Sequence, residues 1–112
     1  MDNKNINLSA GEIEALKKLI LYVKFSCEES ESILYSGSRS INSFFNKLIE
    51  ASDHGTYERS FFKKRNLINE DFVKNKIIKS EVEDNRKLTE DKFEELFEQC
   101  IYPFIHYEVK DK

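Results

Sequence analysis

The sequence predicts a mainly α-helical protein, a small bundle of the four-helix type. Three observations support this fold class: three helix-start signals, helical spacing of apolar residues, and few turn-forming residues. The 112 residues include only three Gly and one Pro, whereas sandwiches and barrels need many turns. Apolar residues make up 39% of the chain, with nine Phe and five Tyr, which is enough for one packed core. We expect one domain over residues 1–112, with disordered termini at 1–7 and 110–112.

The helix-start signals share one pattern. An apolar residue precedes a capping residue, and a second apolar residue follows four positions after the cap. The capping side chain accepts a hydrogen bond from a free backbone N–H, and the apolar pair brackets it. The three signals are Leu8-Ser9 with Ile13, Ile68-Asn69 with Val73, and Leu88-Thr89 with Phe93. Ser9 is also followed by Glu12, which completes a capping box.

The first helix is expected over residues 10–35. Its apolar residues follow a spacing of three and four, and Leu19, Tyr22 and Ile33 widen the apolar arc. The arc is wider than one packing face needs, so we expect a homodimer or an exposed apolar patch. The segment 36–38 then ends the helix, because Gly37 adopts a positive φ at little cost.

A second helix is expected over residues 40–52, with Gly55 as a stop after it, and residues 56–62 are compatible with a short helix. The third helix is expected after Asn69, and five of its residues share the inner face: Phe72, Val73, Lys76, Ile77 and Ser80. The alternative for this region is a β-hairpin within residues 76–88, because Ile77 and Ile78 are β-branched.

The fourth helix is expected to start at Thr89 and to carry an apolar stripe. Pro103 lacks a backbone N–H and clashes with the preceding turn. The helix therefore either kinks at Pro103 or ends near Ile101, and in the second case residues 104–109 are an extended tail.

Residues that would support an enzymatic or metal-binding function are sparse. His54 and His106 lie far apart in the chain, without an identifiable nucleophile or second ligand, and Cys27 and Cys100 fit reduced core thiols better than a disulfide. Phosphate-binding and dinucleotide-binding glycine motifs are lacking. We expect no enzymatic activity, no cofactor, no metal and no small-molecule substrate.

The chain is expected to be cytoplasmic. It contains no apolar run long enough for a membrane span, and its start lacks the basic-then-apolar pattern of a secretory signal. Lys, Ile and Asn are abundant and Arg is rare, which is typical of AT-rich coding. The composition therefore points to a low-GC bacterium, or to a phage or plasmid within one.

Charge segregation is the feature with functional content. Residues 59–79 carry seven basic and two acidic groups, whereas residues 80–112 carry five basic and ten acidic groups. Basic groups beside aromatic residues suit an acidic protein partner, base stacking with phosphate contact, or docking on the acidic fourth helix. The candidate partner-binding residues are Arg59, Phe61, Phe62, Lys63, Lys64, Arg65, Lys74, Lys76 and Lys79.

The sequence favours a small non-enzymatic protein that binds a protein partner or a second copy of itself. Inhibitors, immunity proteins and regulatory accessory proteins have this size and composition. The alternative is a nucleic-acid-binding subunit that uses the same basic segment, although dedicated nucleic-acid binders are more often basic overall, and this chain has a net charge of −3.

Overall fold

The computed structural model describes residues 3–107 and is mainly helical. The helices are α1 (Ala10–Phe25), the 3₁₀ turn η1 (Ser30–Ser32), α2 (Ile33–Ser36), α3 (Arg39–Ala51), α4 (Gly55–Phe62), α5 (Leu67–Glu83) and α6 (Glu90–Ile101). The described residues thus form six α-helices, and the expected four-helix bundle is not confirmed. No strand occurs within residues 3–107, so the alternative hairpin is not seen.

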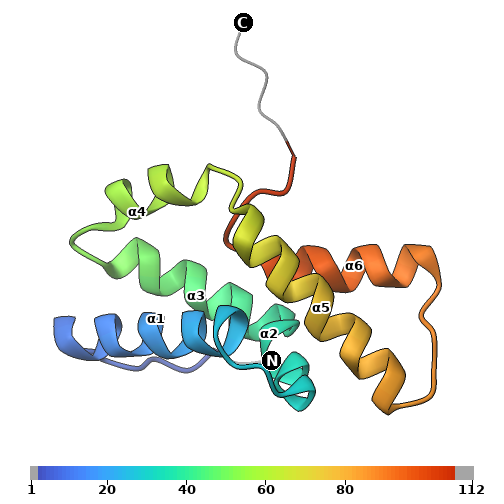
Figure 1. Cartoon of the computed structure of the whole chain (residues 1–112). Helices are drawn as coiled ribbons and strands as arrows, with labels where there is room; N and C mark the ends of the chain where they lie inside the picture. The colour runs from blue at the N-terminus through green and yellow to red at the C-terminus, as the bar shows by residue number, and fades with distance from the viewer. Residues whose placement is uncertain (1–2, 108–112) are drawn as a thin grey trace, which may run out of the picture.

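Two helix pairs organise the fold (Figure 1). α1 packs beside α3, and α5 crosses α6. Contacts of α1 with α5, and of the short α2 with α6, join the two pairs, while α4 extends from the end of α3. No helix within residues 3–107 is long and apolar enough to cross a membrane.

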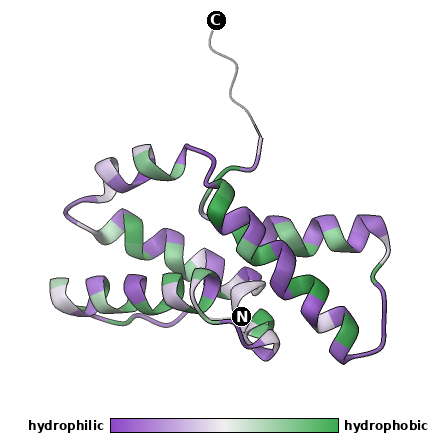
Figure 2. Cartoon of the chain, in the orientation of Figure 1, coloured by the Kyte–Doolittle hydropathy of each residue, from purple (hydrophilic) through white to green (hydrophobic). Residues whose placement is uncertain are grey.

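Buried residues from all the longer helices form one continuous core. Its most enclosed members come from α3, α5 and the end of α6: Phe45, Leu48, Ile49, Val73, Ile77, Cys100 and Ile101. Figure 2 shows hydrophobic and hydrophilic residues alternating along the helices, which is the pattern of amphipathic helices around one core. The expected second helix over residues 40–52 corresponds to α3.

The caps confirm two of the three predicted helix starts. Ser9 forms the full capping box with Glu12, and Thr89 accepts a hydrogen bond from the backbone N–H of Lys92. The third prediction is wrong by three residues, because Asn66 rather than Asn69 is the N-cap of α5. The Asn66 side chain accepts from the Asn69 backbone N–H at 2.9 Å.

The first helix ends ten residues before its predicted end. α1 stops at Phe25, and the chain turns before η1 and α2 begin. The ammonium of Lys76 donates to the carbonyl oxygens of Val23 at 3.0 Å and Cys27 at 3.1 Å. A buried cation thus satisfies carbonyls at the end of α1 that would otherwise lack partners, and it favours the negative end of the helix dipole.

Gly37 and Gly55 have roles that differ from those predicted, because neither glycine has a positive φ. A Cβ on Gly37 would lie 2.8 Å from Cδ1 of Leu96 and 3.1 Å from the carbonyl oxygen of Ile33, so α2 packs closely on α6 at this glycine. Gly55 begins α4 instead of ending α3, and a Cβ on it would lie 2.4 Å from the carbonyl oxygen of Ile49.

The C-terminal part of the chain follows the second of the two alternatives. α6 ends at Ile101, and residues 104–107 have no regular secondary structure. Residues 108–109 of the expected extended tail, and the expected disordered residues 1–2 and 110–112, lie outside the described residues. Residues 3–7 have no regular secondary structure. Both cysteines are free, with Cys100 buried and Cys27 half-buried, in agreement with reduced thiols.

Candidate protein-docking groove

The aromatic groove is a depression of about 570 Å³ that α1, α4, the start of α5 and the C-terminal segment enclose. Its aromatic lining consists of Tyr22 and Phe25 from α1, Tyr57, Phe61 and Phe62 from α4, and Phe104. Phe62 and Phe104 are buried and form the floor, whereas Tyr22, Tyr57 and Phe61 are exposed at the rim. Exposed aromatic residues of this kind are enriched where proteins bind other proteins.

Edge-to-face ring contacts hold the floor of the groove in place. The Phe62 and Phe104 ring centroids lie 5.1 Å apart, Phe25 lies 5.4 Å from Phe104, and Phe45 in the core lies 5.9 Å from Phe62. Pairs in this geometry add about 0.5–1.5 kcal/mol each beyond their burial. The groove is thus formed by side chains that the core itself fixes.

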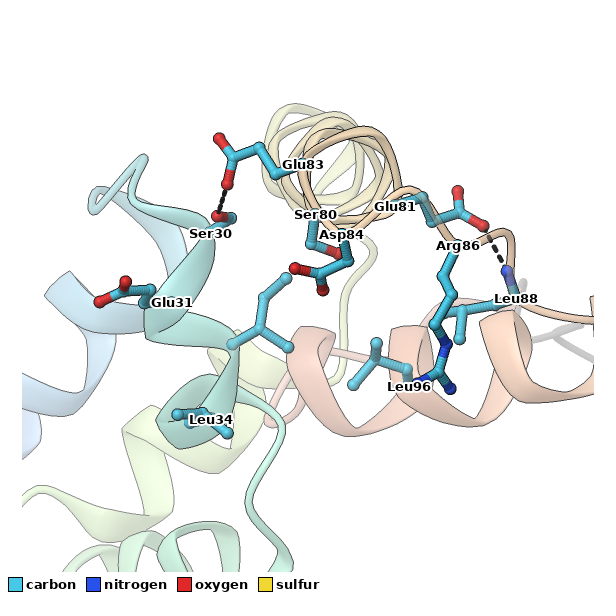
Figure 3. Close-up of a pocket in the computed structure, with 11 residues that line it drawn as sticks. Ser30, Glu31, Leu34, Ser80, Glu81, Glu83, Asp84, Arg86, Leu88 and Leu96 are labelled. Atoms are coloured by element: carbon cyan, nitrogen blue, oxygen red, sulfur yellow. Dashed lines mark hydrogen bonds between the residues drawn. The ribbon is translucent and has the colours of Figure 1, made fainter.

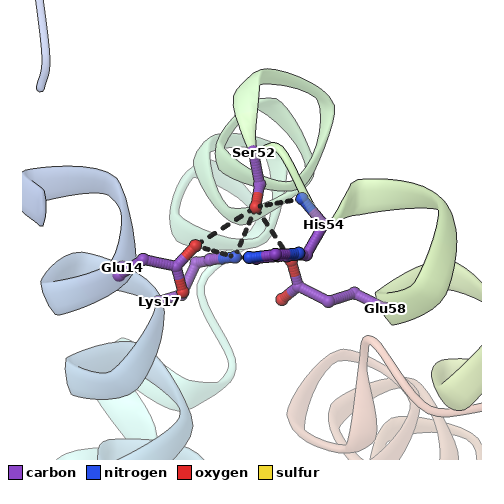
Figure 4. A network of polar contacts seen from close by, with 5 residues as sticks. All are labelled: Glu14, Lys17, Ser52, His54 and Glu58. Atoms are coloured by element: carbon purple, nitrogen blue, oxygen red, sulfur yellow. Dashed lines mark hydrogen bonds and ion pairs between the residues drawn. The ribbon is translucent and has the colours of Figure 1, made fainter. Parts of the chain in front are cut away.

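A polar network beside the groove fastens α4 to α1 (Figure 4). The buried ammonium of Lys17 donates to Ser52 at 2.9 Å and forms ion pairs with Glu58 at 2.5 Å and Glu14 at 2.9 Å. Burial alone would lower the pKa of Lys17, but the hydrogen bonds from Lys17 to Glu58 and Glu14 outweigh it, so its pKa is raised. Glu58 lines the groove, and Lys17 offsets part of its charge while also pairing with Glu14.

His54 takes part in this network through its backbone. Its N–H donates to the Ser52 hydroxyl at 3.2 Å, while its side chain lies in the exposed turn before α4. His106 packs its ring against Phe97 and lies 3.5 Å from a carboxylate oxygen of Glu98. Within residues 3–107, no three metal-ligating side chains gather into a metal site.

The cations near the groove are surface lysines. Lys18 lines the groove, and Lys63 and Lys64 occupy the connector that follows the groove residue Phe62. All three are exposed. With Glu58 paired, the charge at this face is positive, so it favours a partner with acidic residues.

The structure places the nine sequence-predicted residues in different settings, and two of them are corrections. Phe62 and Lys76 are both buried, and of the two only Phe62 lines the groove. Phe62 instead forms the groove floor, and Lys76 donates to carbonyls at the end of α1 and to the Ser32 hydroxyl at 2.9 Å. Helical spacing had already placed Lys76 on the inner face of its helix. That prediction argued against including Lys76 among the candidate partner-binding residues.

The remaining cations of the segment are exposed, and four of them have partners within the chain. Arg59 lies 3.6 Å from Glu50, Arg65 forms a bidentate pair with Glu70, Lys74 lies over the Phe97 ring, and Lys79 lies 3.9 Å from Glu83. Of these, only Lys74 contacts α6 in the interactions described, and it does so through an aromatic ring. These contacts therefore do not show the basic segment docked on the acidic face of the fourth helix, which was one of the three alternatives for this segment.

Sequence reasoning missed the α1 side of the groove. Lys18, Phe25 and the C-terminal Phe104 line it together with the predicted Phe61. Tyr22 had been noted only as part of the wide apolar arc of the first helix. The available signal was this arc, because its apolar residues exceed one packing face, and Tyr22 of the arc remains exposed beside the groove.

An enclosed polar centre lies where α1, α2 and α6 meet. The fully buried ammonium of Lys24 donates to the carbonyl oxygens of Ser36 at 2.7 Å and Gln99 at 3.0 Å. Burial lowers the pKa of Lys24 to about 8, and burial also raises the pKa of Cys100, whose sulfur lies 3.7 Å from the Ser36 hydroxyl. Since this lysine is enclosed and bonded to main-chain carbonyls, we assign it a structural role.

Comparisons of the chain with known protein families, with curated proteins and with solved structures find no match in any of the three.

Proposed function

We propose that this chain is a small non-enzymatic protein that acts by binding another protein, and that the aromatic groove is the docking site. The observation that carries this proposal is the exposure of Tyr57 and Phe61 above a floor that the core holds rigid. Aromatic anchors on a pre-formed surface give binding energy at a low entropic cost. The partner presents an apolar side chain to the groove and acidic residues to Lys18, Lys63 and Lys64.

The mode of action in this proposal is steric blocking. A protein of 112 residues that covers a partner's surface excludes other ligands from it without any chemistry of its own. An inhibitor, immunity or regulatory accessory protein acts in this way. On the basis of composition, we place it in the cytoplasm of a low-GC bacterium, encoded by the bacterium itself or by a phage or plasmid within it.

The test compares two double variants with matched exposure. The groove variant is Tyr57→Ser with Phe61→Ser, and the control is Val82→Ser with Ile78→Ser on the outer face of α5. Tyr57 and Val82 are 76% and 75% exposed, and Phe61 and Ile78 are each 49% exposed. Each chain is immobilised, exposed to extract of candidate host bacteria, and its retained proteins are quantified by mass spectrometry.

The expected partner is retained by the wild type and by the control but lost from the groove variant. With the purified partner, calorimetry should show at least a roughly tenfold weaker affinity for the groove variant, since hot-spot aromatics each contribute about 2 kcal/mol or more. A purified partner that binds the groove variant and the wild type equally well would place the docking site elsewhere.

The charge contribution is tested separately with Lys63→Ser and Lys64→Ser together. Arg65 is kept, because its guanidinium holds the buried Glu70. Partner affinity should fall and should lose part of its salt dependence, while the melting temperature stays close to that of the wild type.

Nucleic-acid binding is the second candidate, and the exposed Tyr57 and Phe61 beside Lys63 and Lys64 favour it as stacking platforms. The burial of Lys76 and the pairing of Arg65 with Glu70 leave fewer cations for phosphates, so we rank it below protein binding. Fluorescence anisotropy with mixed-sequence single-stranded DNA and RNA distinguishes the two. Binding that weakens steeply with salt and is lost in the groove variant would favour this second function.

A further inference from the structure

A second groove lies at the other end of α5, and we call it the acidic groove. It has a volume of about 460 Å³ and is enclosed by η1, α2, the end of α5 and the start of α6. Its apolar floor consists of Ile33, Leu34, Leu88 and Leu96 (Figure 3). Leu34 is 75% exposed, which is unusual for a leucine that lies beside other apolar side chains.

Carboxylates surround this floor. Glu31, Glu83 and Asp84 are exposed at the rim, and Arg86 is the one basic residue among the described residues that line the groove. Glu83 accepts a hydrogen bond from the Ser30 hydroxyl, and Glu81 accepts one from the Leu88 backbone N–H at 2.7 Å. These bonds fix two of the carboxylates, and the rim as a whole is negative.

The end of α5 adds to this negative potential. The last turn of α5 contains no basic residue, although cations are favoured at a helix C-terminus by the helix dipole. Glu83 and Asp84 occupy that end instead, and of these two only Glu83 has an ion pair among the described residues, with Lys79 at 3.9 Å. An external cation placed in the groove would meet both the carboxylates and the negative end of the helix.

The chain itself carries the complementary surface at the opposite end of the same helix. The connector between α4 and α5 begins with the exposed Lys63 and Lys64, and the exposed Phe61 lies two positions before Lys63 in the last turn of α4. Since α5 has 17 residues, the two ends lie about 25 Å apart along its axis. The connector therefore cannot reach the acidic groove of its own chain, but it can reach that of a second copy.

We propose that the acidic groove receives the α4–α5 connector of a second copy of this chain. Lys63 and Lys64 of one copy pair with Glu31 and Asp84 of the other, and Phe61 covers the exposed leucine floor. The contact is heterologous, because it joins two different surfaces, so repetition gives head-to-tail rings or filaments. The connector also adjoins the aromatic groove, so self-association and partner docking compete.

The test uses charge reversal of the full-length chain, with sedimentation velocity over a range of concentration and salt. The acidic groove is reversed by Glu31→Lys with Asp84→Lys, and the connector by Lys63→Glu with Lys64→Glu. Asp53→Lys with Glu94→Lys is the control for the acidic-groove reversal. Both residues are exposed and lie outside the groove, and the two substitutions change the net charge by the same amount as that reversal does. Circular dichroism verifies that each variant is folded.

The wild type and the control should associate, and association should weaken as salt increases. Each reversed variant alone should associate at least tenfold more weakly, and an equimolar mixture of the two should regain association, because both contacts in the mixture join opposite charges. Leu34→Ser should weaken association without changing net charge. A wild type that remains monomeric at every concentration, association that survives both reversals, or a mixture without recovery would each overturn the proposal.

Discussion

The ammonium of Lys24 on α1 donates a hydrogen bond of 3.0 Å to the main-chain carbonyl of Gln99 near the end of α6, and a second one of 2.7 Å to the carbonyl of Ser36. One side chain thus satisfies carbonyls near the ends of two helices, α2 and α6. Lys76 does the same for the end of α1. Buried lysines, rather than glycine caps, connect the helix ends in this fold.

The first prediction is that Lys24 makes the protein more stable at alkaline pH. Its pKa is about 8 in the folded chain and 10.5 in the unfolded chain. Between these values the unfolded state binds more protons, so the free energy of unfolding rises with pH. The rise attributable to Lys24 is about 3 kcal/mol at most, from the size of the pKa difference.

Urea denaturation of the wild type and Lys24→Met from pH 7 to pH 10.5 checks this prediction. Both chains retain Cys100 and Lys76, the titratable groups that face Lys24, so the difference between the two chains isolates the lysine. The buried Cys100 acts in the opposite direction, because its raised pKa favours the unfolded state at high pH. A stability difference that does not change with pH would contradict the assignment.

The second prediction concerns the network that joins α1 to α4. Lys17→Met should destabilise the fold by about 1–3 kcal/mol, because it leaves the half-buried Glu58 without its cation. The exposed pair of Lys79 and Glu83 is the matched control, and Lys79→Met should cost no more than about 0.5 kcal/mol. A double-mutant cycle that combines Lys17→Met with Glu58→Gln should give a coupling energy clearly different from zero. A coupling energy near zero would mean that the 2.5 Å contact between Lys17 and Glu58 does not form in solution.

The third prediction is acid sensitivity through Glu70. Hydrogen bonds from the Arg65 guanidinium lower the pKa of the buried Glu70 carboxylate below its ordinary value of 4.5. The pair is therefore stabilising above about pH 4.5, and this contribution is lost as the pH falls through the lower folded value. Glu70→Gln should cost about 1.5–3 kcal/mol at pH 7, and the difference from the wild type should shrink toward pH 3. A constant difference over this range would argue against the ion pair.

The fourth prediction compares glycine positions. Gly55→Ala and Gly37→Ala should destabilise the protein by about 1–3 kcal/mol, because a Cβ would collide with the Ile49 carbonyl or with Leu96. Gly11→Ala is the control, since a Cβ there meets only the Ser9 hydroxyl at 3.9 Å. That change lies in the first turn of α1 and should stabilise the protein by about 0.5–1 kcal/mol. Thermal denaturation of the three variants ranks them, and a stabilising Gly55→Ala would mean that α4 does not approach Ile49 this closely.

Local signals were sufficient where neighbouring residues determine the structure. The helix over residues 40–52 and the cap at Thr89 were predicted correctly, and residues 56–62 were compatible with the short helix that α4 forms. Each rests on interactions within one or two turns, so a short window of sequence contains the relevant physics. Asn69 was wrongly predicted as the cap, because Asn66 three residues earlier carries a side chain that accepts the same kind of hydrogen bond.

The candidate site was predicted only in part, for a similar reason. The basic and aromatic segment was visible as a run of residue types, and Phe61, Lys63 and Lys64 are exposed there. A count along the chain does not distinguish the faces of a helix, so it included the buried Lys76. The groove also requires α1 and Phe104, which are distant in sequence and meet α4 only in the folded chain.

The sequence by itself determined the helical class, most helix starts and the segregation of charge, because caps, amphipathic spacing and composition act locally. The tertiary structure alone decided where α1 ends, which cations are buried and which surfaces form grooves. These features depend on contacts between distant residues, such as Lys76 with Val23 and Lys24 with Gln99. A buried lysine is tolerated only where the fold brings carbonyl oxygens to it, and no local pattern records that encounter.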